Sequence, residues 1–524
     1  MNPATLGALL ARRSDPAATA LIDRGRGVSF AALGGESRRV ARGLQALGVG
    51  PGDRVALWLP NVPAWLATFF ACAQLGAIAV SVNTRFRSHE LADILYRSRS
   101  RALVFWPEFK GIDFAGILAA CEPEALEHLE SLVIYQESGR ACPEIPFKKK
   151  AIPYATLAGG APLREDFAAP GAGCAIFTTS GTTKAPKFVL HDQRSVVAHA
   201  SDVVRGFGIG GDSVMLLGPP LCGVFGFCSA MAALAAGRPL LMAPVWDAAQ
   251  AARDIATHGV THANATDDAL AQLIENPEVS FSNVRFFGYA AFNPSRADIV
   301  QRAEARGLKL VGLYGTSEIQ ALFARQDKNA PAAERMLAGG RPVSAAAQAR
   351  ARDPETGALQ PHGAPGELEF LAPASRMACY YGDPEATRDA LTGDGFYRSG
   401  DLGTTLADGR FVFLARIGDA LRLGGFLVSP AEIESVVQEA PGIAACQVVG
   451  VLRAEGLRPV AFVIPEKNSS FHEQSVLAYV RGRLAAYKVP LRVFPVEAFP
   501  VTPGANATKI QKGRLREMAE ALLH

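Results

Sequence analysis

Hydrophobic and polar residues alternate along the first half of the chain in blocks that predict helices and strands in turn. The segment Glu36–Leu47 has apolar residues at helical spacing, and Arg54–Leu59 has the composition of a strand. A helix over Pro63–Leu75 and a strand over Ala77–Val82 are expected next. The same rhythm recurs from Ser213 to Val311. Helices that alternate with strands are typical of parallel, doubly wound sheets, so we expect two similar α/β subdomains.

Beyond Gly339 the pattern changes, because glycine and proline become frequent and strand-like stretches become short. Segments such as Gly366–Leu371 lie between turns, which predicts a small β-rich unit. The expected fold class is α/β, with a large N-terminal domain made of two doubly wound subdomains plus this unit, and a small, mobile α+β C-terminal domain. Gly418 lets the backbone turn freely, so the predicted domains are 1–417 and 418–524.

Length, composition and charge narrow the classes of protein. A chain of 524 residues is too long for one hydrophobic core, and its 49% hydrophobic and 20% charged residues are typical of a well-buried globular protein. A net charge of +3 gives no general reason to expect nucleic acid or an anionic membrane surface as a partner. No secretory pattern and no secure membrane span are seen, so we expect a cytoplasmic protein without integral membrane association.

The segment Thr178–Lys187 carries the strongest chemical signal. It follows the apolar run Cys174–Ile176, which predicts the end of a buried strand, and it combines hydroxyl side chains, a glycine and two lysines. Hydroxyls and backbone N–H groups in a tight loop can surround phosphate oxygens, and lysine supplies positive charge. The sequence has no G-x-x-x-x-G-K-[ST] here, so this is not the common P-loop. A phosphate-binding loop and an ordinary flexible turn both fit this segment alone.

Further segments appear in a fixed order after this loop. They are Leu313–Glu318 (L-Y-G-T-S-E), Tyr397–Leu402 (Y-R-S-G-D-L), Ala415–Asp419 (A-R-I-G-D) with Pro430–Glu434 (P-A-E-I-E), and Pro503–Lys512 (P-G-A-N-A-T-K-I-Q-K), with a weaker match at Phe287–Ala291. Together with the loop, they resemble the adenylate-forming superfamily of AMP-forming acyl-CoA synthetases, luciferases and adenylation domains. The resemblance covers nearly the whole chain and is nearest to bacterial fatty-acyl-CoA synthetase-like acid:CoA ligases.

This resemblance implies a ligase that uses ATP, Mg²⁺ and CoA. A carboxylic acid would be converted to an acyl-adenylate with release of pyrophosphate, and CoA would then take the acyl group and release AMP. The C-terminal domain would swing about a hinge between the two half-reactions. The expected partners are these small molecules, and a homodimer is left open.

The resemblance also assigns roles to individual residues. The implied catalytic residues are Lys509, Lys187, Ser317 and Glu318, with Glu318 also holding the metal. The implied ATP- and AMP-binding residues are Thr178, Thr179, Ser180, Gly181, Thr182, Thr183, Gly288, Tyr289, Ala290, Tyr314, Gly315, Thr316, Asp401 and Arg416. The implied acyl pocket comprises Gly223, Phe225, Phe227 and Ile319, the CoA path Gly424 and Gly425, and the hinge Gly418.

Several positions depart from the pattern of the superfamily. Lys184 and Phe188 replace two glycines, so the loop must differ or carry strain if those glycines have positive φ in relatives. Tyr289 stands where a small residue is common, which would make the adenine wall bulkier. Gly223 stands where many relatives have histidine, and phenylalanines lie nearby. The missing histidine, these phenylalanines and the absence of an obvious basic residue from this segment favour a fatty or other apolar monocarboxylate over a diacid. The phenylalanines could equally be core residues.

Three other functions stay open from the sequence. The chain could be a stand-alone adenylating enzyme that loads an acyl-carrier protein, because the motifs do not specify the acceptor. It could be a non-catalytic nucleotide-binding homologue, because two loop glycines are replaced. A luciferase-like oxygenase carries the same motifs. Retention of Lys187, Glu318, Asp401, Arg416 and Lys509 argues against the non-catalytic alternative.

Overall fold

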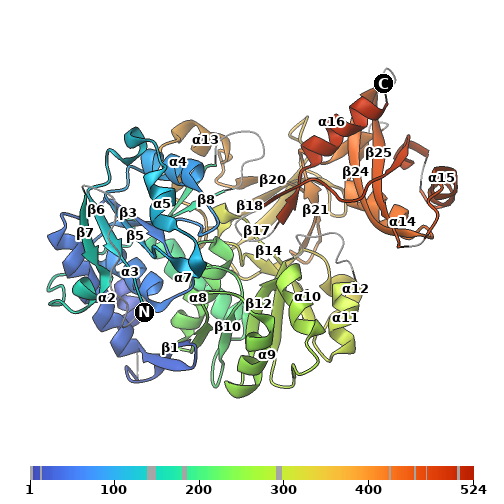
Figure 1. Ribbon diagram of the computed structural model, residues 1–524. Coiled ribbons are helices and arrows are strands. Elements are labelled where there is room, and N and C mark those ends of the chain that lie inside the picture. Colours follow the sequence, from blue (N-terminus) through green and yellow to red (C-terminus); the bar gives the residue numbers. More distant parts are fainter. Residues whose placement is uncertain are drawn as a thin grey trace.

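A computed structural model describes residues 4–11, 15–137, 149–179, 186–290, 298–423, 426–453, 456–467, 469–484, 486–503 and 508–523. In Figure 1 a large body coloured blue to yellow carries two sheets, and the C-terminal elements form a smaller lobe beside β20 and β21. Among the described residues, no helix has the length and apolar character needed to cross a membrane.

The first sheet has eight strands, in the order β19-β9-β8-β4-β3-β5-β6-β7. The strands are β3 (Arg54–Trp58), β4 (Ile78–Ser81), β5 (Ala102–Phe105), β6 (Ser131–Ile134), β7 (Lys150–Pro153), β8 (Gly173–Thr178), β9 (Phe188–Asp192) and β19 (Cys379–Tyr380). Neighbouring strands from β8 to β7 are parallel, whereas β9 pairs antiparallel with both β8 and β19. The chain therefore reverses directly after β8, where the predicted phosphate loop lies.

The second sheet has thirteen strands, in the order β17-β18-β20-β21-β16-β15-β14-β13-β12-β10-β11-β1-β2. The strands are β1 (Thr19–Asp23), β2 (Arg26–Ser29), β10 (Met215–Leu217), β11 (Leu240–Met242), β12 (His262–Thr266), β13 (Phe286–Ala290), β14 (Leu310–Tyr314), β15 (Ala324–Arg325), β16 (Gly339–Pro342), β17 (Gln348–Arg352), β18 (Gly366–Leu371), β20 (Tyr397–Thr405) and β21 (Phe411–Arg416). The strands of the predicted β-rich unit thus continue the sheet of the second subdomain, because β15 pairs antiparallel with β14.

Helices cover these sheets and fill the space between them. They are α1 (Leu6–Ala11), α2 (Phe30–Ala46), α3 (Pro63–Gln74), α4 (Ser88–Ser98), α5 (Phe114–Ala119), α6 (Tyr154–Ala158), α7 (Gln193–Phe207), α8 (Val224–Ala236), α9 (Ala248–Thr257), α10 (Asp267–Glu275), α11 (Ile299–Ala305), α12 (Ala332–Arg335) and α13 (Pro384–Asp389). One hydrophobic core joins α3, α7 and α8 with strands of both sheets. The helix α3 is buried on all its faces, which explains its nearly continuous apolar sequence.

Two boundaries differ from the sequence-based expectation for physical reasons. The helix predicted from Glu36 begins at Phe30, because the Ser29 hydroxyl accepts a hydrogen bond from the Ala32 N–H and caps the helix. The strand β1, although near the N-terminus, belongs to the second sheet. It pairs in parallel with β11, so that Leu21 lies opposite Leu240.

The C-terminal lobe has its own strands and helices. They are β22 (Leu421–Leu423), β23 (Phe426–Val428), α14 (Pro430–Gln438), β24 (Ile443–Arg453), β25 (Gly456–Pro465), α15 (Glu473–Arg481), β26 (Val493–Pro495), β27 (Val501–Pro503), β28 (Thr508–Ile510) and α16 (Lys512–Leu522). Two core clusters are drawn only from residues after Ala420. A separate core supports the domain boundary placed at Gly418, which stays a prediction.

Candidate active site

The ends of the predicted phosphate loop are held together by two hydrogen bonds. The Thr179 N–H donates to the Lys187 carbonyl oxygen over 3.0 Å, and the Lys187 N–H donates to Thr179 Oγ1 over 3.2 Å. Thr178 ends β8, and the Lys187 side chain is exposed. The predicted loop residues Ser180, Gly181, Thr182 and Thr183, together with Lys184, lie outside the described residues.

Phe188, which replaces a glycine of the superfamily pattern, is accommodated in β9. Its side chain is 1% exposed, and the Arg97 guanidinium carbon lies 4.3 Å from the ring centroid. Phe188 is not among the non-glycine residues with positive φ in the described part of the chain. The strain that the sequence made conceivable is therefore not found at this position.

The segment from Tyr314 to Glu318 leaves β14 and enters a 3₁₀ turn over Ser317–Ile319. A side chain at Gly315 would bring its Cβ within 1.9 Å of the Ala321 carbonyl oxygen, so only glycine fits there. Glu318 is 8% exposed. The Tyr380 hydroxyl donates to its Oε1 over 2.8 Å, and the Met377 N–H donates to its carbonyl oxygen over 2.7 Å.

Two buried histidines lie behind this turn. His191, on β9, places Nε2 2.8 Å from the Ser317 carbonyl oxygen. Burial lowers the pKa of His191 to about 4 and the pKa of His199 on α7 to about 3, so both rings are neutral near neutral pH. Because a carbonyl can only accept, Nε2 of His191 carries the proton. Sequence reasoning missed both residues; the available signal was a histidine at the end of an otherwise apolar strand.

Asp401, Tyr314 and Arg416 are brought together by the register of β20 and β21. Asp401 lies opposite Arg416, and the Arg416 Nη1 is 3.0 Å from Asp401 Oδ1. The Tyr314 hydroxyl donates to Asp401 Oδ2 over 2.5 Å. Burial raises the pKa of Asp401 to about 6, against the opposing effects of the Arg416 charge and the Tyr314 hydroxyl. The site thus contains a carboxyl group that titrates close to neutral pH.

The aromatic candidates differ in how much surface they offer. The Tyr314 ring is 7% exposed and packs against Phe370, Phe411 and Phe413, so only a narrow part of it can contact a ligand in this conformation. Tyr289 is 3% exposed, and its hydroxyl donates to the Met336 carbonyl oxygen over 2.7 Å. The Tyr289 ring therefore belongs to the hydrophobic core. The sequence had suggested that this ring would contact adenine instead.

The remaining nucleotide and acyl-pocket candidates are mostly buried. A Cβ at Gly288 would lie 2.4 Å from Asn264 Oδ1 and 2.7 Å from Leu313 Cδ1, so these two side chains fill the space above the glycine. Ala290 and Ser317 are half-buried and Thr316 is buried. Gly223 precedes α8, Phe225 is 5% exposed, and Ile319 is fully buried. The Phe227 ring contacts the rings of Trp65, Phe69 and Phe177 and is a core residue in this conformation.

The C-terminal candidates are placed by their backbone. Gly418 lies in the turn after β21. Lys509 is in β28, opposite Thr502 of β27, and its side chain is outside the described part of the chain. Gly424 and Gly425 also lie outside the described residues. Roles for these residues rest on the sequence and stay predictions.

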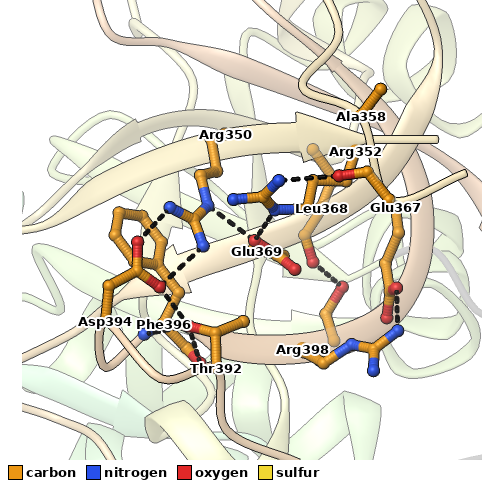
Figure 2. Close-up of polar contacts among 12 residues, drawn as sticks. Arg350, Arg352, Ala358, Glu367, Leu368, Glu369, Thr392, Asp394, Phe396 and Arg398 are labelled. Carbon is orange, nitrogen blue, oxygen red and sulfur yellow. Dashed lines mark hydrogen bonds and ion pairs between the residues drawn. The ribbon is translucent and has the colours of Figure 1, made fainter. Parts of the chain in front are cut away.

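A network of ion pairs supports the strand that carries Asp401. Figure 2 shows Arg350 between two carboxylates, with Nε 2.6 Å from Glu369 Oε2 and Nη1 2.5 Å from Asp394 Oδ2. Arg352 Nε also lies 3.0 Å from Glu369. Glu367 lies on β18, as Glu369 does, and forms an ion pair with Arg398 of β20. It also accepts a hydrogen bond from the N–H of Gly400, which precedes Asp401. A cavity of about 390 Å³ lies beside the network, whose charged groups satisfy one another.

Replacing Glu369 with glutamine is expected to lower the free energy of unfolding by about 2 kcal/mol, because two arginines lose the carboxylate that both contact at a position 1% exposed. Urea unfolding followed by circular dichroism measures this change. The matched control is Asp394→Asn, which removes an exposed partner of the same Arg350 and should change stability little. An equal decrease in the free energy of unfolding of the two variants would show that Glu369 contributes no more to stability than the exposed Asp394.

Comparison with known proteins identifies the same family as the sequence motifs do. The model of the family described as AMP-binding enzyme matches residues 10–381, and that of the AMP-binding enzyme C-terminal domain matches 432–505. A feruloyl-CoA synthase from an Amycolatopsis species is 30% identical over 96% of each chain. A sulfoacetate–CoA ligase from Cupriavidus necator is 29% identical over 97% of each chain. The crystal structure of ATP-bound MatB from Rhodopseudomonas palustris covers 100% of both chains at 25% identity and a TM-score of 0.86.

Proposed function

Because this chain belongs to the AMP-binding enzyme family, we propose that it is an AMP-forming acid:CoA ligase. The observation that carries the proposal is the placement of Tyr314 and Arg416 against the buried carboxylate of Asp401. Glu318 lies in the turn that follows Tyr314. Relatives named as CoA synthases and ligases, and a neighbouring structure that contains ATP, support ATP and CoA as substrates. A cytoplasmic location and a homodimer stay predictions.

The chemistry follows from the poor reactivity of a carboxylate, whose leaving group would be oxide. One carboxylate oxygen attacks the α-phosphorus of ATP, the bond to the β-phosphate oxygen breaks, and pyrophosphate leaves. The CoA thiol then attacks the acyl carbonyl, loses its proton, and AMP leaves. Lys187, the hydroxyls of Thr179–Thr183 and Lys509 would stabilise the charge that develops on the phosphates, while Asp401 and Arg416 would hold the ribose.

Glu318 fits the role of a magnesium ligand. Its Oε1 accepts a hydrogen bond from the Tyr380 hydroxyl, which orients the carboxylate, and Oε2 would bind the cation. Mg²⁺ prefers one or two carboxylates together with water and substrate phosphates, so a cluster of protein ligands is not required. No such cluster of three His, Cys, Asp or Glu residues exists in the described part of the chain. When bound, the metal would neutralise phosphate charge.

For the acid substrate we propose an apolar monocarboxylate. The helix α8 supports this class, since it carries no basic residue that could pair with a second carboxylate and its first eleven residues are buried. The relatives are named for acids as different as ferulate and sulfoacetate, so family membership leaves the acid open. Feruloyl and hydroxycinnamoyl-type aromatic acids therefore belong in the test beside fatty acids.

The proposal predicts pyrophosphate release from ATP that depends on a carboxylic acid. The measurement uses a panel of fatty, aromatic and dicarboxylic acids, with and without CoA, and follows pyrophosphate and acyl-CoA separately. We expect turnover with at least one apolar monocarboxylate and a CoA thioester as product. Adenylate without thioester would favour the carrier-protein-loading alternative. ATP binding without turnover of any acid would favour a non-catalytic nucleotide-binding protein.

A further inference from the structure

Tyr380 contacts two of the predicted catalytic groups at once. Its hydroxyl donates a hydrogen bond to Glu318 Oε1 over 2.8 Å. The ammonium group of Lys187 lies over the face of the Tyr380 ring, 4.5 Å from the ring centroid. The side chain is only 5% exposed, so its position is set by packing. None of the sequence motifs selected this tyrosine.

The backbone fastens Tyr380 to the elements that carry both partners. In β19, Tyr380 lies opposite Val189, two residues beyond Lys187, and the Tyr381 N–H donates to the Phe188 carbonyl oxygen over 2.7 Å. At the other end of the segment, the Met377 N–H donates to the carbonyl oxygen of Glu318 over 2.7 Å. The ring is therefore fixed with respect to the lysine and to the glutamate.

Without an intervening group, Lys187 and Glu318 would attract one another as an ion pair. Such a pair would occupy the lysine that must face phosphate and the carboxylate that must face the metal. No ion pair joins the two residues, although both are described. An aromatic face attracts a cation more weakly than a carboxylate does, so it can release the lysine to a phosphate. Burial and the Glu318 charge raise the pKa of Tyr380 above its usual range, so the hydroxyl stays a donor.

We propose that Tyr380 is a positioning residue that keeps Lys187 and Glu318 apart in the free enzyme, so that both remain available to ATP and its metal. This inference rests on the proposed function, because it assigns phosphate contact to Lys187 and metal binding to Glu318. Lys187 makes a cation–π contact with the face of the Tyr380 ring, and Glu318 accepts a hydrogen bond from the hydroxyl of the same side chain. Loss of the ring allows the two charges to pair.

The test is equilibrium binding of ATP, measured by isothermal titration calorimetry without acid substrate and with EDTA in place of Mg²⁺. For Tyr380→Leu we expect the Kd for metal-free ATP to rise about tenfold, because Lys187 becomes paired with Glu318. Adding Glu318→Gln to this variant should restore metal-free ATP binding, since the competing charge is gone. Tyr380→Phe keeps the ring face and should bind metal-free ATP within about twofold of the wild type.

Matched controls separate this role from general destabilisation. Tyr154→Phe removes a buried tyrosine hydroxyl whose partner is Glu36 Oε1, at 2.6 Å, and should leave ATP binding unchanged. If Tyr380→Leu does not fold, as judged by circular dichroism, Tyr380→Met replaces it in the same binding measurements. Failure of Glu318→Gln to restore binding, or unchanged binding in the leucine variant, overturns the inference. Absence of ATP binding by the wild type in the presence of Mg²⁺ as well as with EDTA overturns the proposed function instead.

Discussion

Replacing Lys509 with alanine will lower the rate of adenylate formation by about 100-fold or more, while a supplied acyl-adenylate will still react with CoA. The reason is that charge develops on the α-phosphate only in the first half-reaction, and one lost donor at such a position typically costs this much. Lys509 lies in the hairpin of β27 and β28, in the C-terminal lobe. The two half-reactions are measured separately, as acid-dependent pyrophosphate release and as CoA thioester formation from synthetic acyl-adenylate.

The control for Lys509 is Lys467→Ala, which removes an exposed lysine from the same lobe. It should leave both half-reactions near the wild-type rate. Equal losses of the two half-reactions in Lys509→Ala would contradict the role given to this lysine, since general damage to the lobe would then explain the result. Retention of adenylation would place the catalytic cation elsewhere in the chain.

Binding of adenosine will weaken about tenfold when the pH is lowered from 7.5 to 5, and Asp401→Asn will remove this dependence. Ribose hydroxyls donate to a carboxylate, so the ionised form of Asp401 binds. With a pKa of about 6 in the free protein, about a tenth of the carboxyl groups is ionised at pH 5. Adenosine is chosen because a phosphate monoester itself titrates near pH 6. Calorimetric titration at several pH values measures the affinity.

The same pKa sets the sign of a stability effect. Because the folded-state pKa of Asp401 is raised above 3.8, this group favours folding most at low pH, and the contribution is lost as the pH rises through about 6.

The matched control for the adenosine measurement is Asp408→Asn. This variant changes an exposed carboxylate in the turn between β20 and β21, where it is hydrogen-bonded to Arg410. Its adenosine affinity should vary with pH as in the wild type. A pH-independent wild type would contradict an ionising carboxyl group at the ribose site.

Much of the secondary structure follows from local pattern. The expected strand Gly366–Leu371 is β18 to the residue, and the helix predicted from Pro63 begins at that residue as α3. Local signals suffice there because an apolar face with helical or strand spacing can be buried in only one way. The motif order was also sufficient to identify the family, since each motif keeps its own short spacing.

Long-range pairing could not be predicted in the same way. Nothing near β1 in sequence indicates that it joins β11, or that the β-rich strands extend the sheet through β15. Tyr289 was placed at an adenine wall by alignment of its motif, whereas its ring enters the core and its hydroxyl reaches Met336. The direction of a strand side chain depends on register and on which helices cover each face, and both depend on distant segments.

The sequence by itself determined which groups are candidates: the loop Thr178–Lys187, the Tyr314–Glu318 motif, and Asp401, Arg416 and Lys509. Only the tertiary structure decided how these groups are tuned. Burial of Asp401 on β20 raises its pKa, His191 makes a hydrogen bond with the Ser317 carbonyl oxygen, and Tyr380 contacts both Lys187 and Glu318. Desolvation and contact depend on which distant segments pack together, and no local spacing of residues contains that information.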